Sequence, residues 1–367
     1  MDESKIHERG QDAASLSAQQ TNTTVTQEMS EQGDQISDLD QLHHFALACV
    51  QAKDWERAFP LLMELIRANE QDSEVLLGLA ITLDALNQFE LLYDIALRII
   101  ALEPNSAHGL AYKARALQKV NRISEAKIAN DQALLLNTNL GLAWVNRSGL
   151  QLLQEKFSDA LRSAQRAIEV APADARAWAN YGVALFNFNR LGEALEAFDK
   201  SLELDTHQLF ALQMKCDILC RIGRMSELIP LLYQARTIQP QDIKTLTLGI
   251  QAFRALEMFE ELKDWSLSLI EITPEDLLAW ENYMRGLRSL GQFIEANDAL
   301  DHLIALDLSN VRFITIKADT LYRLERYREA VTIAERAMRL DQEYPPARRI
   351  YEKSLRMMYQ RKEKKKV

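Results

Sequence analysis

Few residues of this sequence combine the types and the spacing that enzyme or metal chemistry requires. Cys216 and Cys220 stand four positions apart, so on a helix both thiols would share one face and could form a redox pair or bind a metal ion. His43 and His44 are adjacent, and adjacent helical side chains point in different directions, which disfavours a joint metal site. The sequence contains no GxGxxG loop, no GxxxxGKS or GxxxxGKT loop, no HExxH and no GxSxG. We therefore expect no catalytic residues, no metal site, no cofactor and no small-molecule substrate.

The bulk composition favours an all-helical protein with a large apolar core. The chain has 367 residues, a hydrophobic fraction of 47%, only 12 glycines and 8 prolines, and a formal net charge of −10. The negative charge argues against a general nucleic-acid binder. Three cysteines are too few for a disulfide framework and suit a reducing compartment. Because residues 1–38 hold no apolar signal segment and no long apolar run marks a membrane span, we expect a cytoplasmic protein.

A spacing of 34 residues runs through the chain from Asp40 to Leu340. It is clearest at one bulky apolar position that recurs nine times, at Trp55, Phe89, Ile123, Phe157, Leu191, Met225, Phe259, Phe293 and Tyr327. A fixed period of this length is typical of repeat arrays, in which each unit buries its apolar face on its neighbours. Each period shows two amphipathic helical stretches, and the break between them holds Asn or Gly in five repeats, at Asn87, Asn121, Asn189, Gly223 and Gly291.

The repeat resembles the tetratricopeptide repeat, a helix–turn–helix unit of 34 residues. That family prefers a small residue at the eighth position, which here holds Ala46, Ala80, Ala114, Ser148, Gly182, Cys216 and Ala318, with departures at Ile250 and Met284. A packing role for Cys216 therefore stands beside the redox or metal role. The family's alanine at the twentieth position is present in six of the nine repeats. The resemblance covers about residues 39–344 and implies an all-α fold, a right-handed α-solenoid of antiparallel helix pairs.

The segments outside the array differ in charge and in expected structure. Residues 1–38 hold 8 acidic and 2 basic residues and few apolar ones, so we expect a disordered acidic arm. After nine repeats at 39–344, residues 345–360 have the spacing of one more helix with many charges, which we interpret as a C-terminal capping helix. Residues 361–367 form a basic tail that could contact nucleic acid or anionic lipid, pair with the acidic arm, or stay solvated.

The resemblance implies that the first helices of the pairs line a concave groove. In repeats four and five the family's groove positions hold apolar and amide side chains, among them Val145, Asn146, Asn180, Val183, Phe186 and Asn187. Exposed apolar residues mark a contact surface, and an amide can pair with an extended peptide backbone of any sequence. Asn282 takes the position of Asn146 and Asn180 in repeat eight. The alternative is that these asparagines bond to neighbouring helices or water.

A second groove zone is cationic. Repeats six to nine place basic residues at groove positions, against Asp217, Glu281 and Asp319; they are Arg221, Lys244, Arg254, Arg285, Arg288, Arg312 and Arg323. Such a surface favours an acidic segment or a carboxylate, which arginine can hold with two hydrogen bonds. The alternative is a solvated face whose ions pair internally. The family's carboxylate clamp is matched only in part by Arg115, Asn146 and Arg176, and Ala111 replaces its lysine, so we do not expect that clamp.

These features together predict a non-catalytic scaffold or adaptor, similar to a co-chaperone or an assembly factor. It would bind a protein or peptide segment in the groove, with amide and apolar contacts from repeats four and five and arginine contacts from repeats six to nine. Two other functions stay open at this point. One is a regulatory subunit of a separate enzyme, and the other is a nucleic-acid-associated factor that uses the basic tail.

Overall fold

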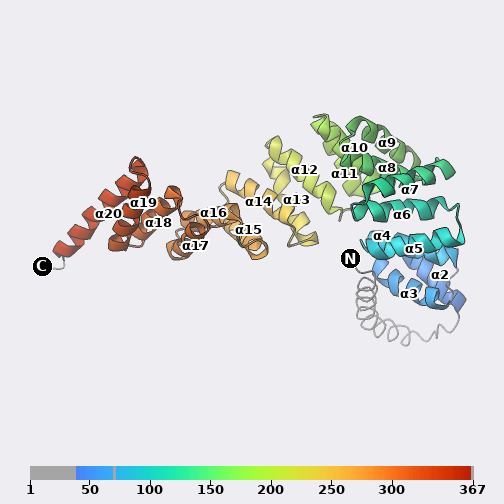
Figure 1. Ribbon diagram of the computed structural model, residues 1–367, viewed down its shortest axis with the longest axis horizontal. Helices are drawn as coiled ribbons and strands as arrows, with labels where there is room; N and C mark the ends of the chain where they lie inside the picture. Colours follow the sequence, from blue (N-terminus) through green and yellow to red (C-terminus); the bar gives the residue numbers. More distant parts are fainter. Residues whose placement is uncertain (1–38, 69–71, 365–367) are drawn as a thin grey trace. The chain divides into compact units, whose positions relative to one another are not determined.

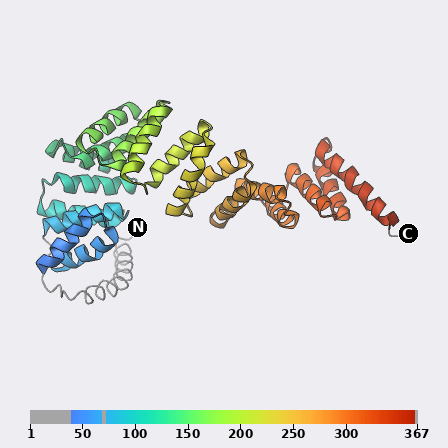
Figure 2. The ribbon, with the colours of Figure 1, turned by 180° about the vertical axis from the view of Figure 1, so that it is seen from behind.

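The computed structural model describes residues 39–68 and 72–364, and within them the chain consists of helices and turns, with no strand (Figures 1 and 2). The first helices of the repeats are α2 (Leu39–Gln51), α4 (Ser73–Ala85), α6 (Ala107–Lys119), α8 (Gly141–Leu153), α10 (Ala175–Asn187), α12 (Leu209–Arg221), α14 (Ile243–Ala255), α16 (Leu277–Ser289) and α18 (Val311–Arg323). The second helices are α3 (Trp55–Ala68), α5 (Phe89–Leu102), α7 (Ile123–Leu136), α9 (Phe157–Val170), α11 (Leu191–Leu204), α13 (Met225–Ile238), α15 (Phe259–Ile272), α17 (Phe293–Leu306) and α19 (Tyr327–Leu340). The predicted all-α repeat fold is confirmed. The predicted acidic arm at 1–38 lies outside the described residues.

The turn between the two helices of each pair has a residue in the left-handed conformation at the same position in every repeat. Nine residues at the 34-residue spacing have φ between 55° and 77°; they are Lys53, Asn87, Asn121, Glu155, Asn189, Gly223, Glu257, Gly291 and Glu325. Asn and Gly adopt this conformation readily, as the sequence predicted for five repeats. Four repeats place Lys or Glu there and carry the steric penalty of a Cβ at positive φ. The geometry of the repeat therefore overrides the local preference of the residue at this position.

Six first helices in the described part of the chain begin at a capping side chain, whereas α8 and α12 do not. Asp72, Asp174 and Asp276 each accept hydrogen bonds from main-chain N–H groups in the first turn of the following helix, at 2.8 to 3.1 Å. Such a cap satisfies donors that have no partner within the helix and contributes about 1 kcal/mol. These residues fix where α4, α10 and α16 start, and so which face each helix buries.

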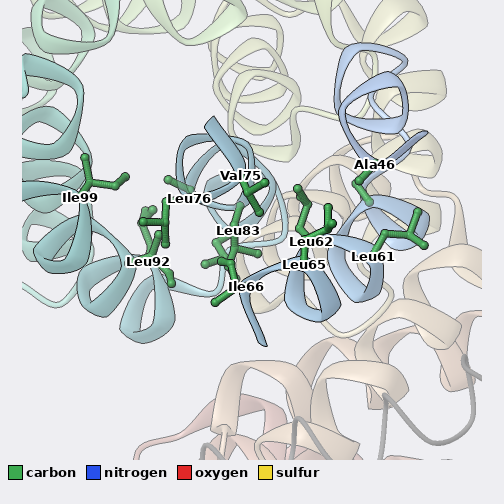
Figure 3. Close-up of a cluster of buried hydrophobic side chains, with 14 of the residues drawn as sticks. Ala46, Leu61, Leu62, Leu65, Ile66, Val75, Leu76, Leu83, Leu92 and Ile99 are labelled. Carbon is green, nitrogen blue, oxygen red and sulfur yellow. The ribbon is translucent and has the colours of Figure 1, made fainter. Parts of the chain in front are cut away.

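The core consists of several clusters of apolar side chains packed between the helices. In Figure 3, Leu76 of α4 lies near Leu92 of α5, and Leu62 of α3 belongs to the same cluster farther along; all three are fully buried. The small eighth-position residues lie where helices approach closely, and Cys216 is fully buried at such a site. Burial raises the pKa of the Cys216 thiol to about 12. Packing therefore accounts for the position of this cysteine.

The helices group into two compact units. The N-terminal unit ends at Asp205 and contains the pairs from α2 to α11, and the C-terminal unit begins at Thr206 and contains α12 to α20. The 34-residue period continues through this boundary, so the pattern of the sequence does not mark it.

Repeat seven in the C-terminal unit replaces the small eighth-position residue with Ile250, which is buried. The close approach of its two helices occurs one position earlier, at Gly249 on α14. A Cβ at this position would lie 2.2 Å from Cε3 of Trp265 on α15, whose indole is 1% exposed. The missing side chain of Gly249 thus leaves the space that the large indole fills.

The last helix, α20 (Pro345–Lys364), packs against the ninth repeat through the buried residues Ala347 and Ile350. It continues through residues 361–364, which we had assigned to the basic tail, because lysine, arginine and glutamate are good helix formers. Residues 365–367 lie outside the described part of the chain. The domain limits at 38, 344 and 360 stay predictions.

Candidate functional site

Amide side chains connect consecutive first helices of the N-terminal unit. Nδ2 of Asn146 on α8 donates to the main-chain oxygen of Ala111 on α6 at 2.8 Å. One repeat later, Nδ2 of Asn180 on α10 donates to the oxygen of Val145 at 3.1 Å and to Oγ of Ser148 at 2.8 Å. Asn146 is buried and Asn180 is half-buried. These are bonds to neighbouring helices, the alternative that the sequence left open.

The other predicted groove residues of this unit differ in accessibility. Val145 is buried, Val183 and Phe186 are half-buried, and Asn187 is exposed. Nδ2 of Asn187 donates to the oxygen of Val183 in its own helix at 2.9 Å. The accessible part of this predicted zone is therefore the face of α10 that carries Val183, Phe186 and Asn187, with the half-buried Asn180 beside it.

A cluster of charged side chains occupies the same layer of first helices. Asp84 at the end of α4 accepts a hydrogen bond from Nε of Arg115 on α6 at 2.9 Å and another from Nη1 of Arg176 on α10 at 2.5 Å. Nη2 of Arg176 also donates to Asp174, the N-cap of α10, at 2.9 Å. The side chain of Asp84 is only 8% exposed. Sequence analysis did not find this cluster, because its carboxylate and its second arginine stand 92 positions apart.

The electrostatics of the cluster keep its carboxylates ionised. Burial by itself would raise the pKa of Asp84, but the charges and hydrogen bonds of Arg115 and Arg176 outweigh it and lower the pKa. The pKa of Asp174 is lowered against the same effect of burial, chiefly by Arg176. Burial and the charge of Asp84 raise the pKa of Tyr112 on α6, because both disfavour a phenolate there. At neutral pH the cluster therefore holds two carboxylates paired with arginine.

The C-terminal unit carries two adjoining pockets, of about 380 and 500 Å³, which share Arg288, Arg312 and Ile316. We call their combined lining the arginine hollow. Its basic side chains come from α16, α18 and α20 and outnumber the acidic residues Glu281 and Asp319 by six to two; they are Arg285, Arg288, Arg312, Arg323, Arg349 and Lys353. Apolar side chains such as Met284, Phe293 and Ile350 line it between the charges. The hollow is thus cationic with an apolar floor.

Glu281 in the hollow is shared by two arginines. Its carboxylate lies 2.8 Å from Nη2 of Arg312 and 3.8 Å from Nη2 of Arg285. The opposite carboxylate, Asp319, pairs with Arg288 and also with Nε of Arg323 at 3.2 Å. Since an arginine has five N–H donors, each guanidinium keeps donors that these pairs do not use.

Arg288 shows the incomplete pairing most clearly. Its Nε is buried and has no hydrogen-bond partner among the described residues. Burial lowers the pKa of Arg288 from its ordinary value, and the neighbouring Arg323 adds to this effect against the attraction of Asp319. Glu281 and Asp319 do not fully offset the repulsion between Arg288 and Arg323. An additional anion in the hollow would therefore reduce this repulsion.

Some of the predicted cationic residues line the arginine hollow and others lie outside it. Arg285 and Arg288 line the arginine hollow, whereas Arg254 on α14 is exposed and outside its lining. Asn282 is buried and donates to the oxygen of Leu278 in its own helix at 2.8 Å. Sequence analysis missed Arg349 and Lys353, because α20 was interpreted only as a cap. Their spacing of four, which puts both on one helical face, was the available signal.

Neither a metal site nor a membrane span is found in the described part of the chain. Among residues 39–68 and 72–364, no three His, Cys, Asp or Glu side chains are grouped so that they could hold a metal ion. No helix among these residues is long and apolar enough to cross a membrane.

Comparison with known proteins agrees with the repeat geometry. The tetratricopeptide repeat family model matches residues 150–208. No curated protein sequence matches the chain. Among solved structures, a chain of the APC/C hetero-tetramer Cut9–Hcn1 is similar, with 16% identity and a TM-score of 0.50 over 82% of this chain and 58% of that one. This chain therefore spans little more than half of that relative, and at this identity the likeness concerns the fold alone.

Two smaller structures also align. PilF of Pseudomonas aeruginosa has 19% identity and a TM-score of 0.48, over 59% of this chain and 97% of PilF. YrrB, described as a TPR protein with an unusual peptide-binding site, has 22% identity and a TM-score of 0.34, over 51% of this chain and 96% of YrrB.

Proposed function

The chain is a tetratricopeptide repeat protein, and we propose that it is a non-catalytic scaffold that binds an acidic segment of a partner protein in the arginine hollow. Arrays of this kind offer extended surfaces made from several repeats, which suits the binding of a partner segment. The proposal includes a co-chaperone-like or assembly role and a cytoplasmic location. The three cysteines, which are free thiols, agree with a reducing compartment.

The observation that carries the proposal is the incomplete pairing of the basic side chains in the hollow. Six basic residues face two carboxylates, and each of these carboxylates is already shared by two arginines. No ion pair is formed by Arg349 or Lys353 within the described residues; Nζ of Lys353 instead lies 4.4 Å from the centre of the Tyr322 ring. Carboxylates of a partner would complete the pairing with charge-assisted hydrogen bonds.

The apolar side chains of the hollow favour a polypeptide over a nucleic acid as the ligand. The half-buried Phe293 and Ile316 can receive apolar side chains of a peptide that alternate with its acidic ones. The accessible face of α10, with Asn180, Val183, Phe186 and Asn187, is proposed as a second contact zone for the partner.

The test is the binding of a fluorescein-labelled peptide of alternating glutamate and leucine, followed by fluorescence anisotropy on the full chain. The double variant Arg285→Gln/Arg312→Gln removes two guanidiniums from the hollow. We expect its affinity to fall about tenfold or more, equivalent to roughly 1.4 kcal/mol. The affinity of the parent chain should also decrease as the salt concentration rises.

The matched control is Arg328→Gln/Arg339→Gln, which removes the same charge from exposed positions of α19 outside the hollow. An equal loss of affinity in both double variants would mean that net charge, and not the hollow, binds the peptide. A single-stranded oligonucleotide of equal charge tests the alternative ligand. Tighter binding of the oligonucleotide than of the peptide would contradict the proposal.

A further inference from the structure

One ion pair in the N-terminal unit joins helices that are not neighbours in the array. Asp84 lies in the last turn of α4, the first helix of repeat two, and Arg176 lies in the first turn of α10, the first helix of repeat five. The two residues are 92 positions apart, whereas the bonds of Asn146 and Asn180 connect consecutive first helices over 35 positions. The pair therefore spans the first helices of the two intervening repeats, α6 and α8.

Both residues of the pair have a further partner near their own helix. The Asp84 side chain is 8% exposed and that of Arg115, its second partner, is 14% exposed. Arg176 is held on its other side by Asp174, so its guanidinium bridges two carboxylates. If the Asp84–Arg176 contact breaks, Asp84 still pairs with Arg115 and Arg176 with Asp174, so the two helices can part without leaving either charge unpaired.

The cluster lies near a residue at an inner position of the array. Tyr112 on α6 takes the same repeat position as Asn146 and Asn180, is 8% exposed, and belongs to the apolar cluster built from α2 to α6. The charges of Asp84, Asp174 and Arg176 all act on its hydroxyl group. The ion pair therefore lies close to the hydroxyl end of a tyrosine whose ring is packed in the core.

We propose that the Asp84–Arg176 ion pair is a latch that holds the first helices of repeats two and five together and closes the inner face of the N-terminal unit over Tyr112. Breaking the pair frees α10 from α4 while the bonds between consecutive first helices remain. A partner that reaches this face must first break the latch. This inference is independent of the arginine hollow, which belongs to the C-terminal unit.

The test measures the separation of the two helix ends that the latch joins. Spin labels are placed on cysteines introduced at Ala85 and Ala173, two exposed positions next to Asp84 and Asp174. Cys49, Cys216 and Cys220 are replaced by alanine in this background. Pulsed electron–electron double resonance on the full chain should give one narrow distribution of the distance between the two labels when the latch is closed.

Two variants break the latch in different ways. Asp84→Asn removes the shared carboxylate, and Arg176→Gln leaves Asp84 paired with Arg115 but cuts the connection to α10. We expect both to lengthen and broaden the distance distribution. Asp159→Asn is the control, since it breaks an exposed pair with Arg162 inside α9 of the same unit. An Arg176→Gln distribution that coincides with that of Asp159→Asn overturns the proposal, whether or not Asp84→Asn folds.

A second readout follows the exposure of Tyr112. Nitration by tetranitromethane is located by mass spectrometry. The nitrated fraction of Tyr112 should be small in the parent chain and several-fold larger in both latch variants. Tyr359 on α20 is 55% exposed and serves as the reference for reagent activity. Equal protection of Tyr112 in the parent and the latch variants would show that the pair does not close this face.

Discussion

The side-chain amide of Asn146 donates to the main-chain oxygen of Ala111, 2.8 Å away and one repeat earlier, and Asn180 makes the same contact with Val145 at 3.1 Å. In repeats four and five, the asparagine at this repeat position therefore connects one first helix to the previous one. In the free chain these two amides are already hydrogen-bonded to the preceding first helix. A partner peptide would have to displace the main-chain oxygens of Ala111 and Val145 to bind them. Asn282 does not make the contact and bonds within its own helix instead.

Replacing Asn146 by alanine should destabilise the N-terminal unit. The variant removes a buried hydrogen bond and creates a small void, and we expect a loss of about 1–3 kcal/mol in the free energy of unfolding. Asn187→Ala on α10 is the control, because Asn187 is exposed and should change stability by less than about 0.5 kcal/mol. Urea unfolding followed by hydrogen exchange at α8 measures both. Equal stability of the two variants would contradict a structural role for Asn146.

The fold could be predicted because every repeat shows the same pattern of apolar, small and turn residues. The positions of Leu76, Ala80 and Asn87 in one repeat are confirmed by their equivalents in the others, so errors at single sites do not matter. The division after Asp205 could not be predicted, since the period continues unchanged through it. Which second-helix residue fills the space at Gly249 also depends on contacts between helices that periodicity does not describe.

The candidate sites were predicted less completely than the fold. Arg285, Arg288, Arg312 and Arg323 were found because repeat position determines which way a first-helix side chain faces. Glu281 and Asp319 were named as the acids of this zone, but which arginine pairs with which was not predicted, because pairs such as Arg312 with Glu281 depend on side-chain conformation across repeats. The Asp84 cluster was missed for a further reason. It requires the curvature of four successive repeats, and this curvature is a sum of small rotations that the sequence does not display.

The left-handed turn residues predict a stabilising substitution. Glu155 has φ 57°, a conformation in which a Cβ is strained and glycine is not. We expect Glu155→Gly to raise the free energy of unfolding by about 0.5–1 kcal/mol. The reciprocal change Gly223→Ala, at φ 74°, should lower it by about 1 kcal/mol. Thermal unfolding of both variants is the measurement, and a loss of stability in Glu155→Gly would sink this account of the turn.

A pair of glycine-to-alanine variants tests the packing of Trp265. At Gly249 an added Cβ would lie 2.2 Å from the indole, so we expect Gly249→Ala to destabilise the C-terminal unit by about 1–3 kcal/mol. At Gly192 on α11 nothing lies within 4 Å, so Gly192→Ala should be neutral or stabilising by up to about 1 kcal/mol. Tryptophan fluorescence during urea unfolding measures the stability of Gly249→Ala and the environment of its indoles. A normal Trp265 environment in Gly249→Ala would mean that the indole has another position available.

The proposed function predicts that one substitution strengthens binding. Glu281 occupies donors of Arg285 and Arg312 that an incoming carboxylate would use. We expect Glu281→Gln to increase the affinity for the glutamate–leucine peptide about two- to fivefold, in line with the small energies of partly exposed ion pairs. Glu295→Gln, which removes the same charge from an exposed position on α17, should have little effect. Unchanged affinity in Glu281→Gln would indicate that the peptide does not reach these two arginines.

The latch should lose its effect only in acid. Because the folded-state pKa of Asp84 is lowered, the stabilisation from its ion pairs is fully present above the ordinary aspartate pKa of about 3.9 and is lost as the pH falls through the lowered value. At pH 7 we expect Asp84→Asn to be less stable than the parent by roughly 1–3 kcal/mol. This is below the value for a fully buried pair, because the Arg176 side chain is 31% exposed. Thermal unfolding of both chains between about pH 7 and pH 2 measures the difference. It should stay constant down to about pH 4 and then close, since a protonated Asp84 resembles the amide of the variant. A difference that closes already near pH 6 would assign the effect to another group, and one that persists at the lowest pH would show that the carboxylate charge does not hold the latch.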